Sequence, residues 1–136
     1  MDYFFLDASA LGKRYVPEIG TPLINHLFRM VSRDRMTALI LGLGEVLSIL
    51  VRSRNGGRLS EQAFRQAMAD LRAEIIDTDD FRLQTISDEL VRASLPLIER
   101  HALNATDAII CVLHCGWPKR FDQQVMRWFS SLQMLA

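Results

Sequence analysis

The chain has 136 residues, of which 49% are hydrophobic and 24% charged, and this composition predicts one soluble globular domain with a core of its own. Its 16 basic residues balance its 16 acidic residues, which argues against a strongly basic nucleic-acid-binding protein. No apolar run is long enough and free enough of charge to suggest a membrane partner, and two cysteines without a secretory segment favour a reducing, cytoplasmic setting.

Strand-like and helix-like segments alternate along the chain, which predicts an α/β fold. The first half is expected to contain a strand at 3–6, a helix near 8–15, a helix to about Val31 with Thr21 as N-cap and Pro22 as first residue, a short strand or lead-in at 36–40, and the helix around Glu45 that ends at Gly56 and Gly57. The second half is expected to contain a helix at 61–73 capped by Ser60, a strand at 74–77, a turn at Asp79 and Asp80, a helix from about 88 to 100 that Ser87 caps and Pro96 bends or shortens, and a last helix opened by Asp107.

Asp7 directly follows the first predicted strand. In an open parallel α/β sheet, ligand crevices form at the carboxyl ends of the strands, because the loops that leave the strands line that edge. An ordinary alternative is that Asp7 only caps the helix that begins at Ala8, a common role for aspartate. The position therefore predicts either a helix cap or a ligand-binding carboxylate.

Glu45 lies in a helix with almost no polar face, since apolar side chains surround it on both sides along the sequence. We expect its carboxylate to be partly desolvated, which is costly unless a cation or hydrogen bonds compensate. One alternative partner is any of the many arginines of the chain.

Asp107 is expected in the first turn of its helix, with Asn104 or Thr106 as the cap. It could be there only because the helix dipole favours an acid at that end. A single mechanism would nevertheless explain Asp7, Glu45 and Asp107 together. Magnesium and manganese prefer hard oxygen ligands, and such ions lower the pKa of bound water and align it with phosphorus in nucleases.

Three blocks of sequence resemble the PIN-domain ribonucleases, and among them the VapC-type toxins of type II toxin-antitoxin systems. They are FFLDASAL at 4–11 followed by KRYVPE at 13–18, then GEV at 44–46 within its apolar helix, and LNATDAI at 103–109. The order and spacing of the blocks are more specific than any one of them, and the resemblance extends over most of the chain up to Ile110.

This resemblance implies a three-layer fold, a central parallel sheet with surrounding helices, in a single domain over 1–136. It implies that Asp7, Glu45 and Asp107 bind Mg²⁺ or Mn²⁺ and form the catalytic site of an endoribonuclease, and that the hydroxyl of Ser9 orients Asp7. It also implies an RNA substrate, a homodimer and capture by a small cognate antitoxin.

The tail over 111–136 departs from the family, in which a long helix and an apolar strand ending in a fourth acid are expected. Asp122 is the candidate for that fourth metal ligand, but the residues before it make a poor strand, so the last strand is expected to be missing or altered. Back-translation offers one explanation. Shifting the frame of the tail by a nucleotide permits LRSALRLAKALRSAGDALVLVAADA, which would make the chain a frame-shifted product of a once complete gene.

Arg52, Arg54 and Arg58 cluster around a glycine-containing turn and could contact RNA or an acidic segment of a partner, although such clusters are often only a solvated helix end. Two other functions stay open. The chain could be a catalytically inactive PIN fold that still binds an antitoxin or dimerises. It could also be a structural α/β protein whose acids only cap helices and form salt bridges.

Overall fold

A computed structural model describes residues 3–115 of the chain. It divides into two compact units, Met1–Thr85 and Ile86–Ala136, and each is considered by itself. In the described part of the chain, no helix has both the length and the apolar character that crossing a membrane requires. The expectation that 1–136 forms a single domain stays a prediction.

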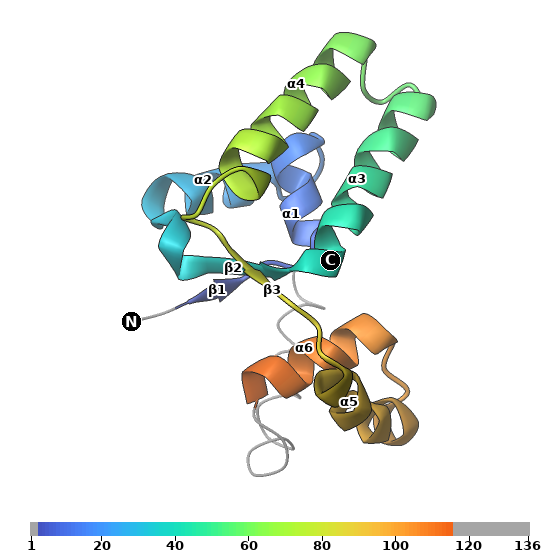
Figure 1. Cartoon of the computed structure of the whole chain (residues 1–136). Helices are drawn as coiled ribbons and strands as arrows, with labels where there is room; N and C mark the ends of the chain where they lie inside the picture. Colours follow the sequence, from blue (N-terminus) through green and yellow to red (C-terminus); the bar gives the residue numbers. More distant parts are fainter. Residues whose placement is uncertain (1–2, 116–136) are drawn as a thin grey trace. The chain divides into compact units, whose positions relative to one another are not determined.

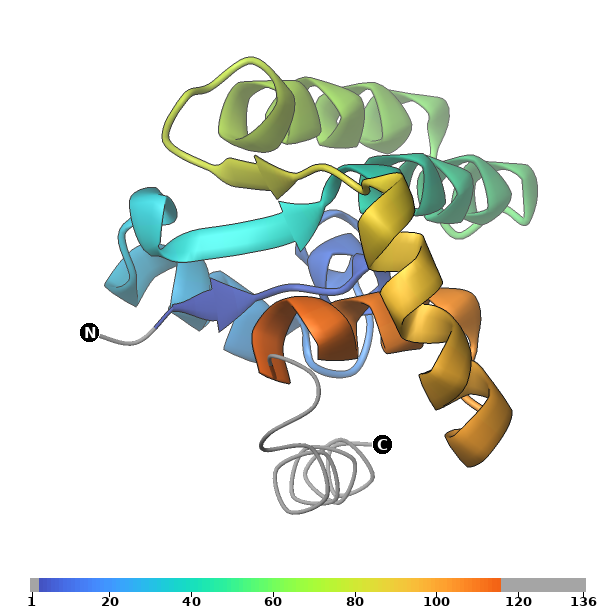
Figure 2. The ribbon, with the colours of Figure 1, turned by 60° about the horizontal axis from the view of Figure 1, so that its bottom comes forward.

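The first unit is an α/β structure built on a parallel sheet, as the alternating pattern predicts. The three strands described lie in the order β1-β2-β3, with Phe4 opposite Met36 and Thr37 opposite Arg82. Helices α1 to α4 lie on one side of this sheet (Figures 1 and 2). The elements are, in order, β1 (Phe4–Phe5), α1 (Ala8–Tyr15), α2 (Thr21–Met30), the 3₁₀ helix η1 (Arg33–Arg35), β2 (Met36–Leu39), α3 (Ile40–Asn55), α4 (Glu61–Leu71), the π-helix η2 (Arg72–Ile76) and β3 (Arg82–Gln84).

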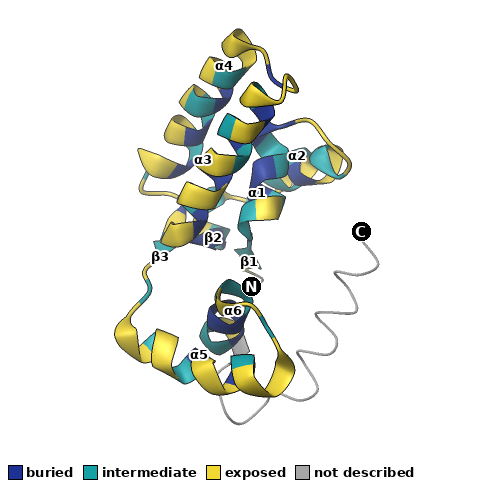
Figure 3. Cartoon of the chain, turned by 90° about the vertical axis from the view of Figure 1, so that its right-hand side faces the viewer, coloured by how far each residue is buried: buried dark blue, intermediate teal, exposed yellow. Residues whose placement is uncertain are grey.

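The core of this unit forms where α1 packs against α3. Leu11, Val46 and Leu50 are fully buried there, and Figure 3 shows the buried faces of α3 and α4 in dark blue. Gly12 allows the two helices to approach closely, because a Cβ atom on it would lie 3.1 Å from Cδ1 of Ile49. Two of the candidate site residues are carried by these helices, since Asp7 is the N-cap of α1 and Glu45 lies in α3.

The start of α2 differs from the prediction by one residue. Gly20, not Thr21, is the N-cap, and its φ of 96° lies in the left-handed region that glycine adopts at low cost. Thr21 is the first helical residue, and Pro22 follows it. The Thr21 hydroxyl donates to the carbonyl of Lys13 at 2.8 Å and accepts from the N–H of Glu18 at 2.9 Å. Thr21 therefore fixes the loop between α1 and α2 instead of capping α2.

The predicted strand at 74–77 is wrong. Residues Arg72–Ile76 form the π-helix that continues α4, and the third strand is β3 at Arg82–Gln84. The acids predicted to turn the chain after a strand, Asp79 and Asp80, therefore precede one. A short apolar run does not distinguish a strand from a buried helical turn. Here the run is helical, and Ile75 is completely buried in it.

The π-helix brings Glu74 into a polar cluster with Arg14 and Tyr15. Glu74 Oε1 accepts from Arg14 Nη2 at 2.7 Å, and Glu74 Oε2 accepts from Arg14 Nε at 3.2 Å and from the Tyr15 hydroxyl at 3.1 Å. Burial alone favours the protonated form of Glu74, but the hydrogen bonds and charge of Arg14 outweigh it and lower the pKa of Glu74. Burial, with the charge of Glu74, raises the pKa of Tyr15, which stays a neutral donor.

The second unit contains α5 (Asp88–His101) and α6 (Ala105–Cys115), which pack against each other through Leu97, Ala108 and Cys111. Ser87 caps α5 as predicted, since its hydroxyl accepts from the N–H of Leu90 at 3.2 Å. The helix continues past Pro96 to His101, so the proline does not shorten it.

Replacing Ser60 with alanine is expected to lower the free energy of unfolding by about 1 kcal/mol, because the Ser60 hydroxyl caps α4 by accepting from the N–H of Ala63 at 3.1 Å. Urea unfolding followed by circular dichroism would measure the change. Ser48→Ala is the control: the Ser48 hydroxyl donates to the carbonyl of Gly44 four residues earlier in α3 and caps no helix end, so little or no loss is expected. Equal losses in the two variants would contradict the capping role.

Candidate functional site

Asp7 stands at the carboxyl end of β1 and caps α1. Its Oδ1 accepts from the N–H of Ala10 at 2.7 Å, and the Ser9 hydroxyl lies 3.2 Å from Oδ1 and 3.1 Å from Oδ2. The strand end is fixed beside β2, since the N–H of Leu6 donates to the carbonyl of Thr37 at 2.8 Å. A carboxylate has about four acceptor positions, so Asp7 can cap the helix and still accept a ligand. Both interpretations of Asp7 are thus compatible.

The expected contact between Ser9 and Asp7 is present. It fixes the orientation of the carboxylate, because one hydroxyl is shared between the two oxygens. Asp7 itself is half-buried, whereas Ser9 is exposed. The carboxylate is therefore held by its own helix and remains accessible on one side.

Glu45 is exposed on α3, so the expectation that its carboxylate is partly desolvated is wrong. The helix buries Val46 and Leu50 on one face, while Leu41 and Leu47 are exposed. The apolar residues around Glu45 are thus divided between the core and the surface. Within residues 3–115 no arginine forms an ion pair with Glu45, which removes that alternative for the described part of the chain.

Asp107 lies in the first turn of α6, in the second unit. Its N–H donates to Oδ1 of Asn104 at 2.8 Å, and Nδ2 of Asn104 donates to Oδ2 of Asp107 at 2.6 Å. Asn104 rather than Thr106 is therefore the cap. These contacts suit the alternative in which Asp107 is favoured by the helix dipole, and they leave Oδ1 of its carboxylate available as a ligand.

The three predicted metal ligands are distributed over both units, with Asp7 and Glu45 in the first and Asp107 in the second. Carboxylate oxygens are the donors that Mg²⁺ and Mn²⁺ prefer, so the chemistry of the set fits these ions. Over residues 3–115 no three His, Cys, Asp or Glu side chains are placed together so that they could hold a metal ion. Asp122, the predicted fourth ligand, lies outside the described residues.

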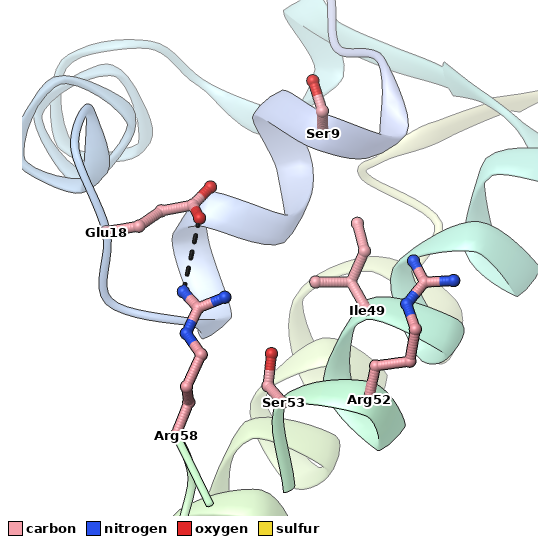
Figure 4. A pocket seen from close by; sticks show the side chains of 6 residues that line it. All are labelled: Ser9, Glu18, Ile49, Arg52, Ser53 and Arg58. Carbon is pink, nitrogen blue, oxygen red and sulfur yellow. Dashed lines mark hydrogen bonds and ion pairs between the residues drawn. The ribbon is translucent and has the colours of Figure 1, made fainter. Parts of the chain in front are cut away.

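A pocket of about 290 Å³ opens beside Ser9 (Figure 4). Arg58 Nη2 lies 3.4 Å from Glu18 Oε2 in this pocket, and Lys13 Nζ lies 3.7 Å from Glu18 Oε1. Arg52 reaches the pocket from α3. The residues that line it are Ser9, Glu18, Ile49, Arg52, Ser53 and Arg58.

Arg54 is separate from the other two arginines of the predicted cluster. Its guanidinium stacks over the ring of Phe64 at 4.4 Å from the centroid, and Nη1 lies 3.9 Å from Oε2 of Glu61. These contacts connect α3 to α4 and suit a structural role. Arg52 and Arg58, by contrast, share a pocket.

Sequence reasoning assigned no role to Glu18 or Ser53. A signal for Ser53 was present, because Ile49, Arg52 and Ser53 fall on one face of a helix at spacings of three and four residues. No comparable signal predicts that Glu18 pairs with Arg58, which is 40 residues away along the chain. That contact depends on how α1 packs against α3.

The fold and this site define an α/β protein with a capped, accessible carboxylate at the carboxyl end of the first strand of a parallel sheet. No protein-family model matches the chain, and no match was found among curated proteins or among solved structures.

Proposed function

We propose that this chain is a metal-dependent endoribonuclease of the PIN type, resembling the VapC toxins, that hydrolyses RNA phosphodiester bonds. The observation that most supports this function is the position of Asp7, held by Ser9 and Ala10 at the carboxyl end of β1 with acceptor capacity left for a ligand. The contact from Ser9 restricts the orientation of this carboxylate, as a metal ligand needs.

In this proposal, Asp7, Glu45 and Asp107 hold Mg²⁺ or Mn²⁺, with Asp122 as the candidate fourth ligand. When bound, the ion would activate the attacking water and neutralise charge on the leaving oxygen. Ser9 keeps the Asp7 carboxylate in one orientation. Glu45 enters this proposal through the resemblance, and its exposed carboxylate is accessible to a ligand.

The proposal includes a homodimer and a cognate antitoxin in the cytoplasm. Exposed apolar side chains support a partner surface of this kind, since Ile19, Leu23 and Met30 are all exposed on α2 or just before it.

A second candidate function is an inactive PIN fold that only dimerises or binds an antitoxin. It is favoured by the sequence after Ile110, which departs from the family pattern and offers only Asp122 as a fourth acid. Loss of one carboxylate would weaken metal binding, because a magnesium site already uses few protein ligands.

Cleavage of a panel of structured and single-stranded RNAs by the purified chain tests both functions. We expect cutting with Mg²⁺ or Mn²⁺ and none with EDTA. A parallel protein carrying the tail of the shifted reading frame is the control for the altered C-terminal sequence. If only that protein cuts RNA, while the present chain is folded but cuts none, the present chain is an inactive PIN fold.

Replacing Ser9 with alanine is expected to lower the cleavage rate by about tenfold to a hundredfold, because the Asp7 carboxylate would lose the group that orients it. Single-turnover cleavage over a range of Mg²⁺ concentrations would measure the effect. Ser9→Thr retains the hydroxyl and should recover most of the rate. A rate unchanged in Ser9→Ala would contradict the role of Ser9.

A further inference from the structure

The geometry points to a phosphate-binding subsite in the pocket beside Ser9, in which Arg52 and Arg58 bind a backbone phosphate of RNA and Glu18 is the internal anion that this phosphate displaces. The inference rests on the proposed ribonuclease function, because it takes the ligand to be RNA. The subsite would give the RNA a contact that is separate from the three candidate metal ligands.

Arg52 is the cation available for a ligand. Its guanidinium stands at the pocket on the α3 side, across Ile49 from Glu18 and Arg58 (Figure 4). Within the described part of the chain no carboxylate forms an ion pair with Arg52. The planar fork of arginine binds phosphate through two parallel hydrogen bonds.

Glu18 occupies the position of an anion in this pocket. Its carboxylate lies between Arg58, at 3.4 Å, and Lys13, at 3.7 Å. Both ion pairs are partly exposed, so each is weak and can exchange for another anion. A phosphate that entered the pocket would compete with Glu18 for Arg58 and gain Arg52, whereas Glu18 would keep Lys13.

The subsite adjoins the acids without including them. Ser9 lines the pocket and also donates to Asp7, so it connects the two. On α3, Arg52 follows Glu45 by seven residues, which at about 1.5 Å per residue corresponds to about 10 Å along the helix. That separation exceeds the reach of one phosphate, so the bound phosphate is expected to be a neighbour of the cleaved one.

Binding measured without cleavage tests the subsite. The full chain with Asp7→Asn, in EDTA, would be titrated against a short fluorescein-labelled single-stranded RNA, alone and with Arg52→Ala, Glu18→Gln or Arg65→Ala added. Arg65→Ala is the matched control, since it removes the same charge from a side chain that is 77% exposed and, within residues 3–115, forms an ion pair only with Glu61 on its own helix. Thermal unfolding of each protein confirms that it is folded.

Arg52→Ala is expected to weaken RNA binding by about tenfold and to reduce the slope of log affinity against log salt by about 0.7, the value for one contact to a single strand. Glu18→Gln is expected to tighten binding by about two- to fivefold, because Arg58 loses its internal competitor. Arg65→Ala should change binding much less than Arg52→Ala.

Equal effects of Arg52→Ala and Arg65→Ala would overturn the subsite, as would weaker binding in Glu18→Gln. This binding experiment can succeed or fail whether or not the chain cleaves RNA. Binding that depends on Arg52 in a chain that cuts no RNA would retain the subsite and overturn the ribonuclease. Metal-dependent RNA cleavage, together with RNA binding that does not change in Arg52→Ala, would support the ribonuclease and overturn the subsite.

Discussion

Replacing Asp7 with asparagine should abolish metal-dependent RNA cleavage, with a loss of at least about a hundredfold, while thermal unfolding stays unchanged. Asparagine retains an oxygen that can accept from the N–H of Ala10 and the hydroxyl of Ser9, and it caps helices as well as aspartate does. It lacks the negative charge that a hard divalent cation requires. The substitution therefore separates the two roles of Asp7, which alanine would remove together.

Cleavage time courses at saturating Mg²⁺ would measure the rate, and calorimetry would measure the melting temperature. Asp34→Asn is the matched control, since Asp34 is an acid of the same unit in η1 that lies outside the candidate site. Full activity in Asp7→Asn would leave Asp7 as a helix cap only and remove the main support for the proposed function.

Replacing Glu74 with alanine should lower the free energy of unfolding at neutral pH by about 2 kcal/mol. The substitution leaves the Arg14 guanidinium and the buried Tyr15 hydroxyl without their shared acceptor, and an unsatisfied buried donor is costly. The side chains of Arg14 and Glu74 are only 25% and 15% exposed, so water replaces the lost contacts poorly.

The loss should depend on pH in a defined direction. The pKa of Glu74 is lower in the folded protein than in the unfolded chain, where a glutamate titrates at about 4.3. Its contribution is therefore complete above that value and is lost as the pH falls through the lower, folded pKa. The difference between parent and Glu74→Ala should be largest at neutral pH and shrink in acid.

Urea unfolding at pH 7 and at several acidic values would measure this difference. Glu61→Ala is the control, because Glu61 is exposed and its pairs with Arg65 and Arg54 should contribute less than about 1 kcal/mol. A Glu74→Ala loss no larger than that of Glu61→Ala, or one that is independent of pH, would contradict the stabilising role of the cluster.

The helix boundaries that the sequence predicted correctly depend on contacts between near neighbours. Asp7, Ser60 and Ser87 each accept from a backbone N–H three residues later, so a short stretch of chain contains everything that sets the start of the helix. The contact between Ser9 and Asp7, which the family resemblance implied, is also one between near neighbours. The candidate metal ligands were likewise found by their place at the ends or in the middle of such elements.

The failed predictions concern contacts between distant segments. Residues 74–77 resemble a strand because Ile75 and Ile76 form an apolar run, but they belong to a π-helix and its end, and Glu74 in that π-helix pairs with Arg14, 60 residues earlier. The apolar sequence around Glu45 could not show which side of α3 would be buried, and that side is set by packing against α1 and α4.

The sequence by itself predicted where α1, α4 and α5 begin and placed acids directly after β1, within α3 and in the first turn of α6. Only the tertiary structure decided that Glu45 is exposed, that Arg54 stacks on Phe64, and that Arg52 and Arg58 share a pocket. The physical reason is that helix capping and turn formation depend on contacts between residues close in the sequence. Burial and charge pairing depend instead on which helix faces meet when the helices pack.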